Sequence, residues 1–90
     1  MRDPITVLVV DDDQMIRSVV RIALQRVNDW TVIEAENGSV GVSVAADEQP
    51  DVILLDFQMP RMDGAQTIAA LKENPETSRL PVIFLTAKTG

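Results

Sequence analysis

The apolar residues of this chain form short runs that alternate with stretches in which apolar positions recur every three or four residues. The runs lie at 5–10, 31–35, 52–55 and 82–85, and they are rich in Val, Ile and Leu. Such runs are typical of strands, and the almost wholly apolar ones are typical of strands covered on both faces. We therefore expect four strands.

The stretch at 14–27 has the period of an amphipathic helix. Apolar residues such as Met15 and Val19 fall on the face that we expect to be buried, while its arginines, Arg17 among them, fall mainly on the outer face. Asp13 stands at the N-cap position, where a carboxylate can accept a hydrogen bond from a free backbone N–H group. The pattern therefore predicts a capped helix directly after the first strand.

Two further helices are expected between the later strands. The first, over 39–48, is a weak helix because glycine and valine lower its propensity, and Val40 is expected on its buried face. The second begins at residue 63 or 64 and ends at about residue 74, before Pro75. Strands that alternate with helices in this way predict an α/β fold with a parallel sheet and right-handed crossovers.

Polar side chains stand where three of the predicted strands end. Asp11 and Asp12 follow the first strand, Asp56 follows the third, and Thr86 follows the fourth. The carboxyl ends of parallel strands share one rim of the sheet, so we expect these side chains to meet there. Each has an ordinary explanation when taken alone, such as a helix cap or the start of a loop. Their joint occurrence in a short chain indicates a functional site.

The chemistry of these side chains suits a hard cation and a phosphoryl group. Clustered carboxylates repel one another, whereas Mg²⁺ prefers carboxylate oxygens and usually carries a phosphate as a further ligand. Carboxylates also act as covalent phosphoryl acceptors, so Asp56 is a candidate nucleophile toward phosphorus. The hydroxyl of Thr86 could then hydrogen-bond a phosphoryl oxygen and relay the modification to a loop.

Composition narrows the choice of partners and location. The net charge is −6, from 8 basic and 14 acidic residues, which argues against nucleic acid or an anionic membrane as a direct ligand. The chain has no cysteine and no histidine, so disulfides, thiolate metal sites and a phosphohistidine on this chain are excluded. No apolar run is long enough for a bilayer span or a signal peptide, and a cytoplasmic domain is expected.

Four motifs together resemble one protein family. They are Val-Val-Asp-Asp-Asp at 9–13, Ala-Glu-Asn-Gly at 35–38, Asp-Val-Ile-Leu-Leu-Asp-Phe-Gln-Met-Pro-Arg-Met-Asp-Gly at 51–64 and Leu-Pro-Val-Ile-Phe-Leu-Thr-Ala at 80–87. Along essentially its whole length the chain resembles the receiver domain of bacterial response regulators, the signalling half of two-component systems. The resemblance implies a flavodoxin-like fold with strand order 2-1-3-4-5.

The resemblance also assigns a role to each site residue. It implies that Asp56 accepts a phosphoryl group from a phosphohistidine of a sensor histidine kinase or phosphotransfer protein. Asp12 would bind Mg²⁺ directly and Asp11 mostly through water, with Asp56 and the backbone carbonyl of Gln58 completing the protein ligands. Thr86 matches the hydroxyl that moves on activation in this family. Such a domain is a signalling module and not an enzyme.

Residues 1–90 match a receiver domain that is incomplete at its C-terminal end. The matching region lacks the family's fourth helix, fifth strand and fifth helix, and with them a lysine and an aromatic residue that serve signalling. Lys88 is a candidate substitute for the lysine, although a solvated loop residue is the more economical interpretation. An apolar edge at 82–85 predicts marginal stability or a homo-oligomer, and a longer natural chain could carry an output domain.

Two alternative functions remain open at the level of the sequence. The first is a receiver fold that acts purely as an interaction surface and is not phosphorylated. The second is a phosphatase of the haloacid-dehalogenase type, in which Asp11 would be the nucleophile and Asp13 the acid/base. This second alternative leaves the run from Asp56 to Gly64 unexplained.

Overall fold

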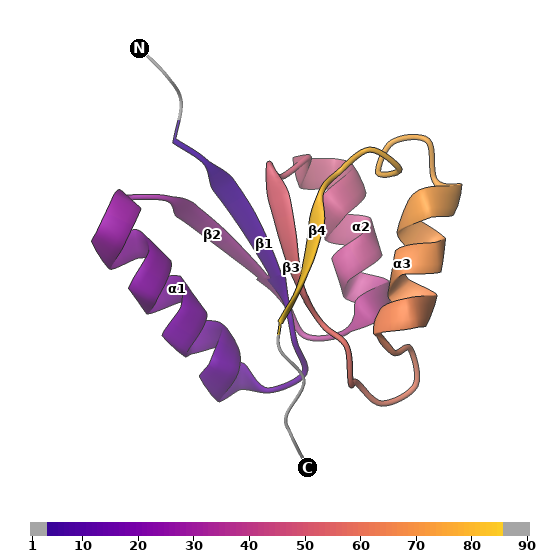
Figure 1. The fold of residues 1–90 in the computed structure, drawn as a ribbon, viewed down its shortest axis with the longest axis horizontal. Coiled ribbons are helices and arrows are strands. Elements are labelled where there is room, and N and C mark those ends of the chain that lie inside the picture. The colour runs from indigo at the N-terminus through magenta and orange to yellow at the C-terminus, as the bar shows by residue number, and fades with distance from the viewer. Residues whose placement is uncertain (1–3, 86–90) are drawn as a thin grey trace.

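The structure is a computed structural model that describes residues 4–85, and strands alternate with helices throughout this part of the chain (Figure 1). None of its helices is long and apolar enough to cross a bilayer. The predicted alternation is confirmed, with bounds close to those expected from the sequence. The elements are β1 (Thr6–Val10), α1 (Gln14–Asn28), β2 (Thr31–Ala35), α2 (Gly38–Glu48), β3 (Val52–Asp56), α3 (Gly64–Glu73) and β4 (Val82–Leu85).

The described strands form one parallel sheet in the order β2-β1-β3-β4. This order confirms the expected flavodoxin-like arrangement. Helix α1 lies on one face of the sheet, and α2 and α3 lie together on the other (Figure 1). Because all the strands run in the same direction, their carboxyl ends and the loops that follow them share one rim.

Strand β1 lies at the centre of the sheet and supplies much of the core. Leu8 and Val10 pack toward α2 and α3, whereas Val7 and Val9 point to the opposite face, as strand alternation requires. All four side chains are almost completely buried. The apolar run at 7–10 is therefore explained by cover on both faces of the strand. The buried cluster on the α2 and α3 side comprises Leu8, Val10, Ala35, Ala45, Ile53, Leu55, Met59 and Leu71.

Each helix begins at a polar N-cap residue. The Asp13 carboxylate accepts from the Met15 N–H at 2.9 Å, which confirms the predicted cap of α1. Asn37 caps α2 in the same way, and Asp63 caps α3 in a capping box with Gln66. These caps fix the points at which the chain leaves the site rim and enters each helix.

The prediction of which residues of α1 face the sheet is wrong in part. Met15 and Val19 are 73% and 59% exposed, whereas the Arg17 side chain is only 13% exposed. Arg17 points inward because its guanidinium finds two oxygen acceptors there, the backbone carbonyl of Asp11 and the carboxylate of Glu34. A largely buried cation with well-placed acceptors can thus replace an apolar side chain at a helix–sheet contact.

Val40, predicted on the buried face of α2, is also exposed. Gly41 and Ala45 face the sheet instead. A Cβ atom on Gly41 would lie 2.9 Å from a methyl group of Val10, so the bare backbone lets α2 approach β1 closely. The close approach rotates Val40 toward solvent.

Strand β4 lies at the edge of the described sheet and pairs with β3. Ile83 and Phe84 are 56% and 43% exposed, in agreement with the expected apolar edge. On the face that carries α1, an apolar groove of about 360 Å³ runs beside this strand. Self-association through the edge stays a prediction. The groove is lined by Ile5, Val7, Leu24, Trp30, Asp51, Val52, Leu54 and Ile83.

Candidate functional site

Three carboxylates meet at the carboxyl ends of β1 and β3. Asp11, Asp12 and Asp56 each offer an oxygen atom, and these atoms all lie within 4.8 Å of one another. The sheet brings them together because Val10 pairs with Leu55 in the parallel register, so that the next residues of both strands emerge side by side. Asp11 and Asp56 are buried, and Asp12 is exposed.

The backbone of Asp11 continues the sheet by one residue. Its N–H donates to the carbonyl of Ala35 at 3.1 Å, beyond the last pair of β1 and β2. Its carboxylate accepts from the Asp13 N–H at 2.9 Å. The position of Asp11 is therefore fixed both by the neighbouring strand and by the turn into α1.

Asp56 has one satisfied and one unsatisfied carboxylate oxygen. Its Oδ1 accepts from the Gln58 N–H at 3.2 Å, while its buried Oδ2 has no hydrogen-bond partner among residues 4–85. A buried oxygen without a donor is costly, and its negative charge is costlier beside two further carboxylates. A divalent cation offsets the repulsion among the three carboxylates and prefers oxygen donors of this kind, so these residues fit Mg²⁺.

The loop after Asp56 closes on itself before α3 begins. The N–H of Gly64 donates to the carbonyl of Phe57 at 2.9 Å. A Cβ atom on Gly64 would lie 2.7 Å from the Phe57 Cα, which is closer than real Cβ contacts allow. Arg61, in the middle of the loop, has a positive φ of 68°. Gly64 is therefore needed for the loop to turn back against the end of β3.

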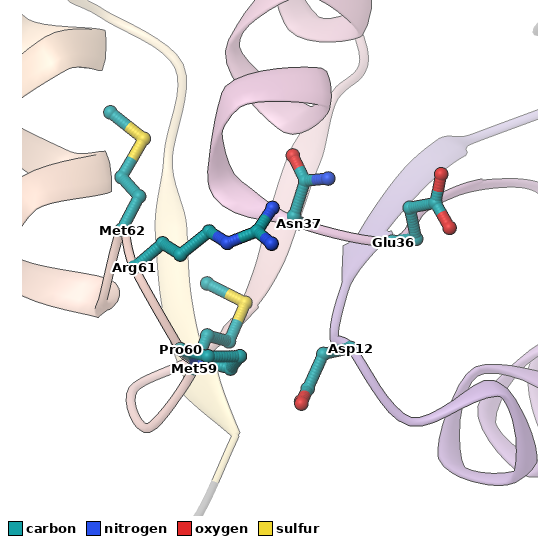
Figure 2. Close-up of a pocket in the computed structure, with 7 residues that line it drawn as sticks. All are labelled: Asp12, Glu36, Asn37, Met59, Pro60, Arg61 and Met62. Atoms are coloured by element: carbon teal, nitrogen blue, oxygen red, sulfur yellow. The ribbon is translucent and has the colours of Figure 1, made fainter.

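A cleft of about 370 Å³ opens beside Asp12. Figure 2 shows the Arg61 side chain reaching across it toward Asn37, with Asp12 and Glu36 on the opposite side. The cleft thus presents a cation and an amide next to one of the three clustered carboxylates. Its lining consists of Asp12, Glu36, Asn37, Met59, Pro60, Arg61 and Met62.

The other predicted site residues have different outcomes. Gln58 lies next to Asp56, to which its N–H donates, and Thr86 and Lys88 lie outside the described residues. Asp13 is exposed and serves as a cap, so the alternative in which it is an acid/base gains no support.

The inward position of Arg17 was not predicted from the sequence. The available signal was Glu34, a charged residue inside a short strand of a sheet covered by helices. Such a residue needs a partner of opposite charge.

The structure and sequence both match known proteins. The family model of the response regulator receiver domain matches residues 7–90. The N-terminal domain of a response regulator receiver protein from Methanoculleus marisnigri superposes with a TM-score of 0.87 at 40% identity, over 92% of this chain and 67% of that one. The chemotaxis protein CheY4 of Vibrio cholerae gives 0.87 at 31% identity, over 98% and 72% of the respective chains.

This chain spans only part of the length of the curated relatives that it matches. The transcriptional regulatory protein YdfI of Bacillus subtilis is 41% identical over 81 residues, which are 89% of this chain but 37% of that protein. Protein PilG of Pseudomonas aeruginosa is 39% identical over 88 residues, or 98% of this chain and 64% of its own length. The agreement of the family model, the relatives and the fold leads to one conclusion: the chain belongs to the response regulator receiver family.

Proposed function

We propose that this domain is a Mg²⁺-dependent phosphoacceptor in which Asp56 receives the phosphoryl group. Receiver domains are signalling domains of two-component systems and interact with histidine kinases or phosphotransfer proteins. The observation that carries the proposal is the buried Oδ2 of Asp56, which has no partner in the described part of the chain and lies in a group of three carboxylates.

The residues around Asp56 fit the protein side of phosphoryl transfer. Asp12 and Asp56 would hold the cation directly, Asp11 mostly through water, and the backbone carbonyl of Gln58 would complete the set. A bound Mg²⁺ neutralises charge on the transferring group. The hydrogen bond from Gln58 to Oδ1 leaves Oδ2 as the free nucleophilic oxygen.

The reaction exchanges one bond to phosphorus for another. Oδ2 of Asp56 forms the new P–O bond, and the bond between phosphorus and the imidazole nitrogen of the donor breaks. The electron pair of the broken bond stays on the imidazole, so the product is an acyl phosphate on Asp56 and a free histidine on the donor. Thr86 would hydrogen-bond the new phosphoryl oxygens and relay the change.

Direct labelling tests this proposal. Wild-type protein incubated with Mg²⁺ and acetyl phosphate is expected to gain one phosphoryl group, which intact-mass and peptide-mapping spectrometry place on Asp56. The Asp56→Asn variant keeps the shape of the side chain but loses the nucleophile, and it is expected to remain unlabelled. Chelation of Mg²⁺ is expected to prevent labelling of the wild-type protein.

The matched control is Asp47→Asn, which makes the same change at an exposed position on α2 and is expected to label normally. Label on Asp11 would support a phosphatase of the haloacid-dehalogenase type instead. If wild-type protein takes no label with saturating Mg²⁺, the domain acts as an interaction module and the proposal is wrong.

A further inference from the structure

One arginine joins three elements next to the acidic cluster. Arg17, in the first turn of α1, donates through its terminal nitrogen Nη1 to the backbone carbonyl of Asp11 at 2.6 Å and through Nε to Oε1 of Glu34 at 3.1 Å. These contacts connect α1, the end of β1 and strand β2. A guanidinium suits the task because it presents several donors in a fixed planar arrangement.

Glu34 holds this arginine in place from the neighbouring strand. Its second oxygen lies 3.0 Å from Nε of Arg21, an ion pair that lacks the alignment of a hydrogen bond. The Arg17 and Glu34 side chains are 13% and 29% exposed, so water screens their pairing less than it screens a surface ion pair. Glu34 therefore fixes the direction in which Arg17 points.

The peptide between Asp11 and Asp12 is the group that this arrangement orients. The N–H of Asp11 is fixed by Ala35 on β2, and its carbonyl is fixed by Arg17. With both backbone groups of Asp11 held, the plane of the next peptide is set, and with it the direction in which exposed Asp12 leaves the sheet. A small rotation of this peptide would move the Asp12 carboxylate out of the cluster of three.

We propose that Arg17, held by Glu34, is a positioning residue that orients Asp11 and Asp12 for binding of the cation. The inference rests on the proposed function, because it concerns the same acidic cluster. Groups that orient metal ligands without touching the metal commonly change its affinity by about 10- to 100-fold when they are removed. Arg17 acts on the backbone and not on a ligand atom, so we expect an effect of about tenfold.

Metal binding in the absence of any phosphodonor measures this effect. Mn²⁺, which electron paramagnetic resonance detects in its free form, serves as the probe for the hard-cation site. Arg17→Met is expected to raise the Kd for Mn²⁺ about tenfold. The same substitution at Arg26, an exposed residue in the last turn of α1, is expected to leave it unchanged. Equal Kd values for wild type and Arg17→Met would overturn the inference.

Two further variants separate positioning from charge and from a general loss of folding. Arg17→Lys keeps the charge but replaces the planar guanidinium, with its separate Nε and terminal donors, by a single ammonium group. It is therefore expected to recover only part of the affinity, and complete recovery would show that charge alone matters. Glu34→Gln keeps the size of the side chain and is expected to weaken binding in the same direction but less. No change in Glu34→Gln would contradict its role in holding Arg17.

Labelling kinetics give a readout that reduced folding would not produce. In Arg17→Met, the Mg²⁺ concentration for half-maximal labelling of Asp56 is expected to rise, while the rate at saturating Mg²⁺ stays close to that of the wild type. A lower rate at saturation with an unchanged half-maximal concentration would overturn the inference. Wild-type protein that binds no Mn²⁺ would overturn both proposals, whereas normal wild-type binding with an unaffected Arg17→Met would overturn this one alone.

Discussion

Replacement of Gly64 by alanine is expected to lower both the stability of the domain and the metal affinity of the acidic cluster. The added Cβ would lie 2.7 Å from the Cα and 3.2 Å from the carbonyl oxygen of Phe57, and both of these are backbone atoms. Backbone cannot move aside without displacing the end of β3, where Asp56 lies. Overpacking of this kind costs about 1–3 kcal/mol of the free energy of unfolding.

Urea denaturation and Mn²⁺ titration of the same protein test this expectation. We expect Gly64→Ala to lower the denaturation midpoint and to raise the Kd for Mn²⁺ at temperatures where the variant is still folded. The control is Ser43→Ala at an exposed position on α2, which is expected to leave the denaturation midpoint and the Kd for Mn²⁺ unchanged. If Gly64→Ala has the same denaturation midpoint and the same Kd for Mn²⁺ as the wild type, the loop can open without cost and this prediction is wrong.

Replacement of Ile53 by alanine is expected to cause a larger loss of stability. Ile53 lies on β3, is 1% exposed, and belongs to the buried cluster between the sheet and the helices α2 and α3. Truncation of a fully buried isoleucine costs about 2–5 kcal/mol, because apolar burial is lost and a cavity remains. Small domains have about 5–15 kcal/mol in total, so the variant loses a large share of its stability.

Ile22 offers the same substitution in a different environment. It lies on α1, is 50% exposed, and its replacement by alanine also improves helix propensity. We expect the free energy of unfolding to change by less than about 1 kcal/mol. Urea denaturation curves fitted with one shared m-value measure this change. Equal losses at Ile53 and Ile22 would mean that the exposed face of α1 is buried in solution, for example by a second copy of the chain.

The order of the elements and the sheet topology could be predicted from the sequence because both depend on local patterns. The apolar runs, the polar caps and the alternation of strand and helix all agree with one parallel sheet. The orientation of α1 could not be predicted in the same way. Met15 and Val19 have the correct period for a buried face. Arg17 points inward instead, because the Asp11 carbonyl at the end of β1 and the Glu34 carboxylate on β2 accept its hydrogen bonds, and these acceptors are placed by the tertiary fold.

The same distinction applies to the site. Asp11, Asp12 and Asp56 could be expected to converge because each follows a strand, and the topology of the sheet then places them together. The cleft beside Asp12 could not be foreseen, since Glu36 and Arg61 come from different loops whose relative positions depend on tertiary packing. Thr86 lies outside the described residues, and its role stays a prediction.

The position of Trp30 has a consequence for how this domain can be observed. It is the only tryptophan of the chain, and it lies in the apolar groove directly before β2 begins. The five residues of β2 span about 17 Å, and the acidic cluster lies at the far end of the sheet. Tryptophan emission is therefore an optical signal of the groove and of global unfolding, and it is separated in space from the chemistry at Asp56. In a single sample, tryptophan fluorescence can therefore report unfolding while a second, independent signal reports metal binding.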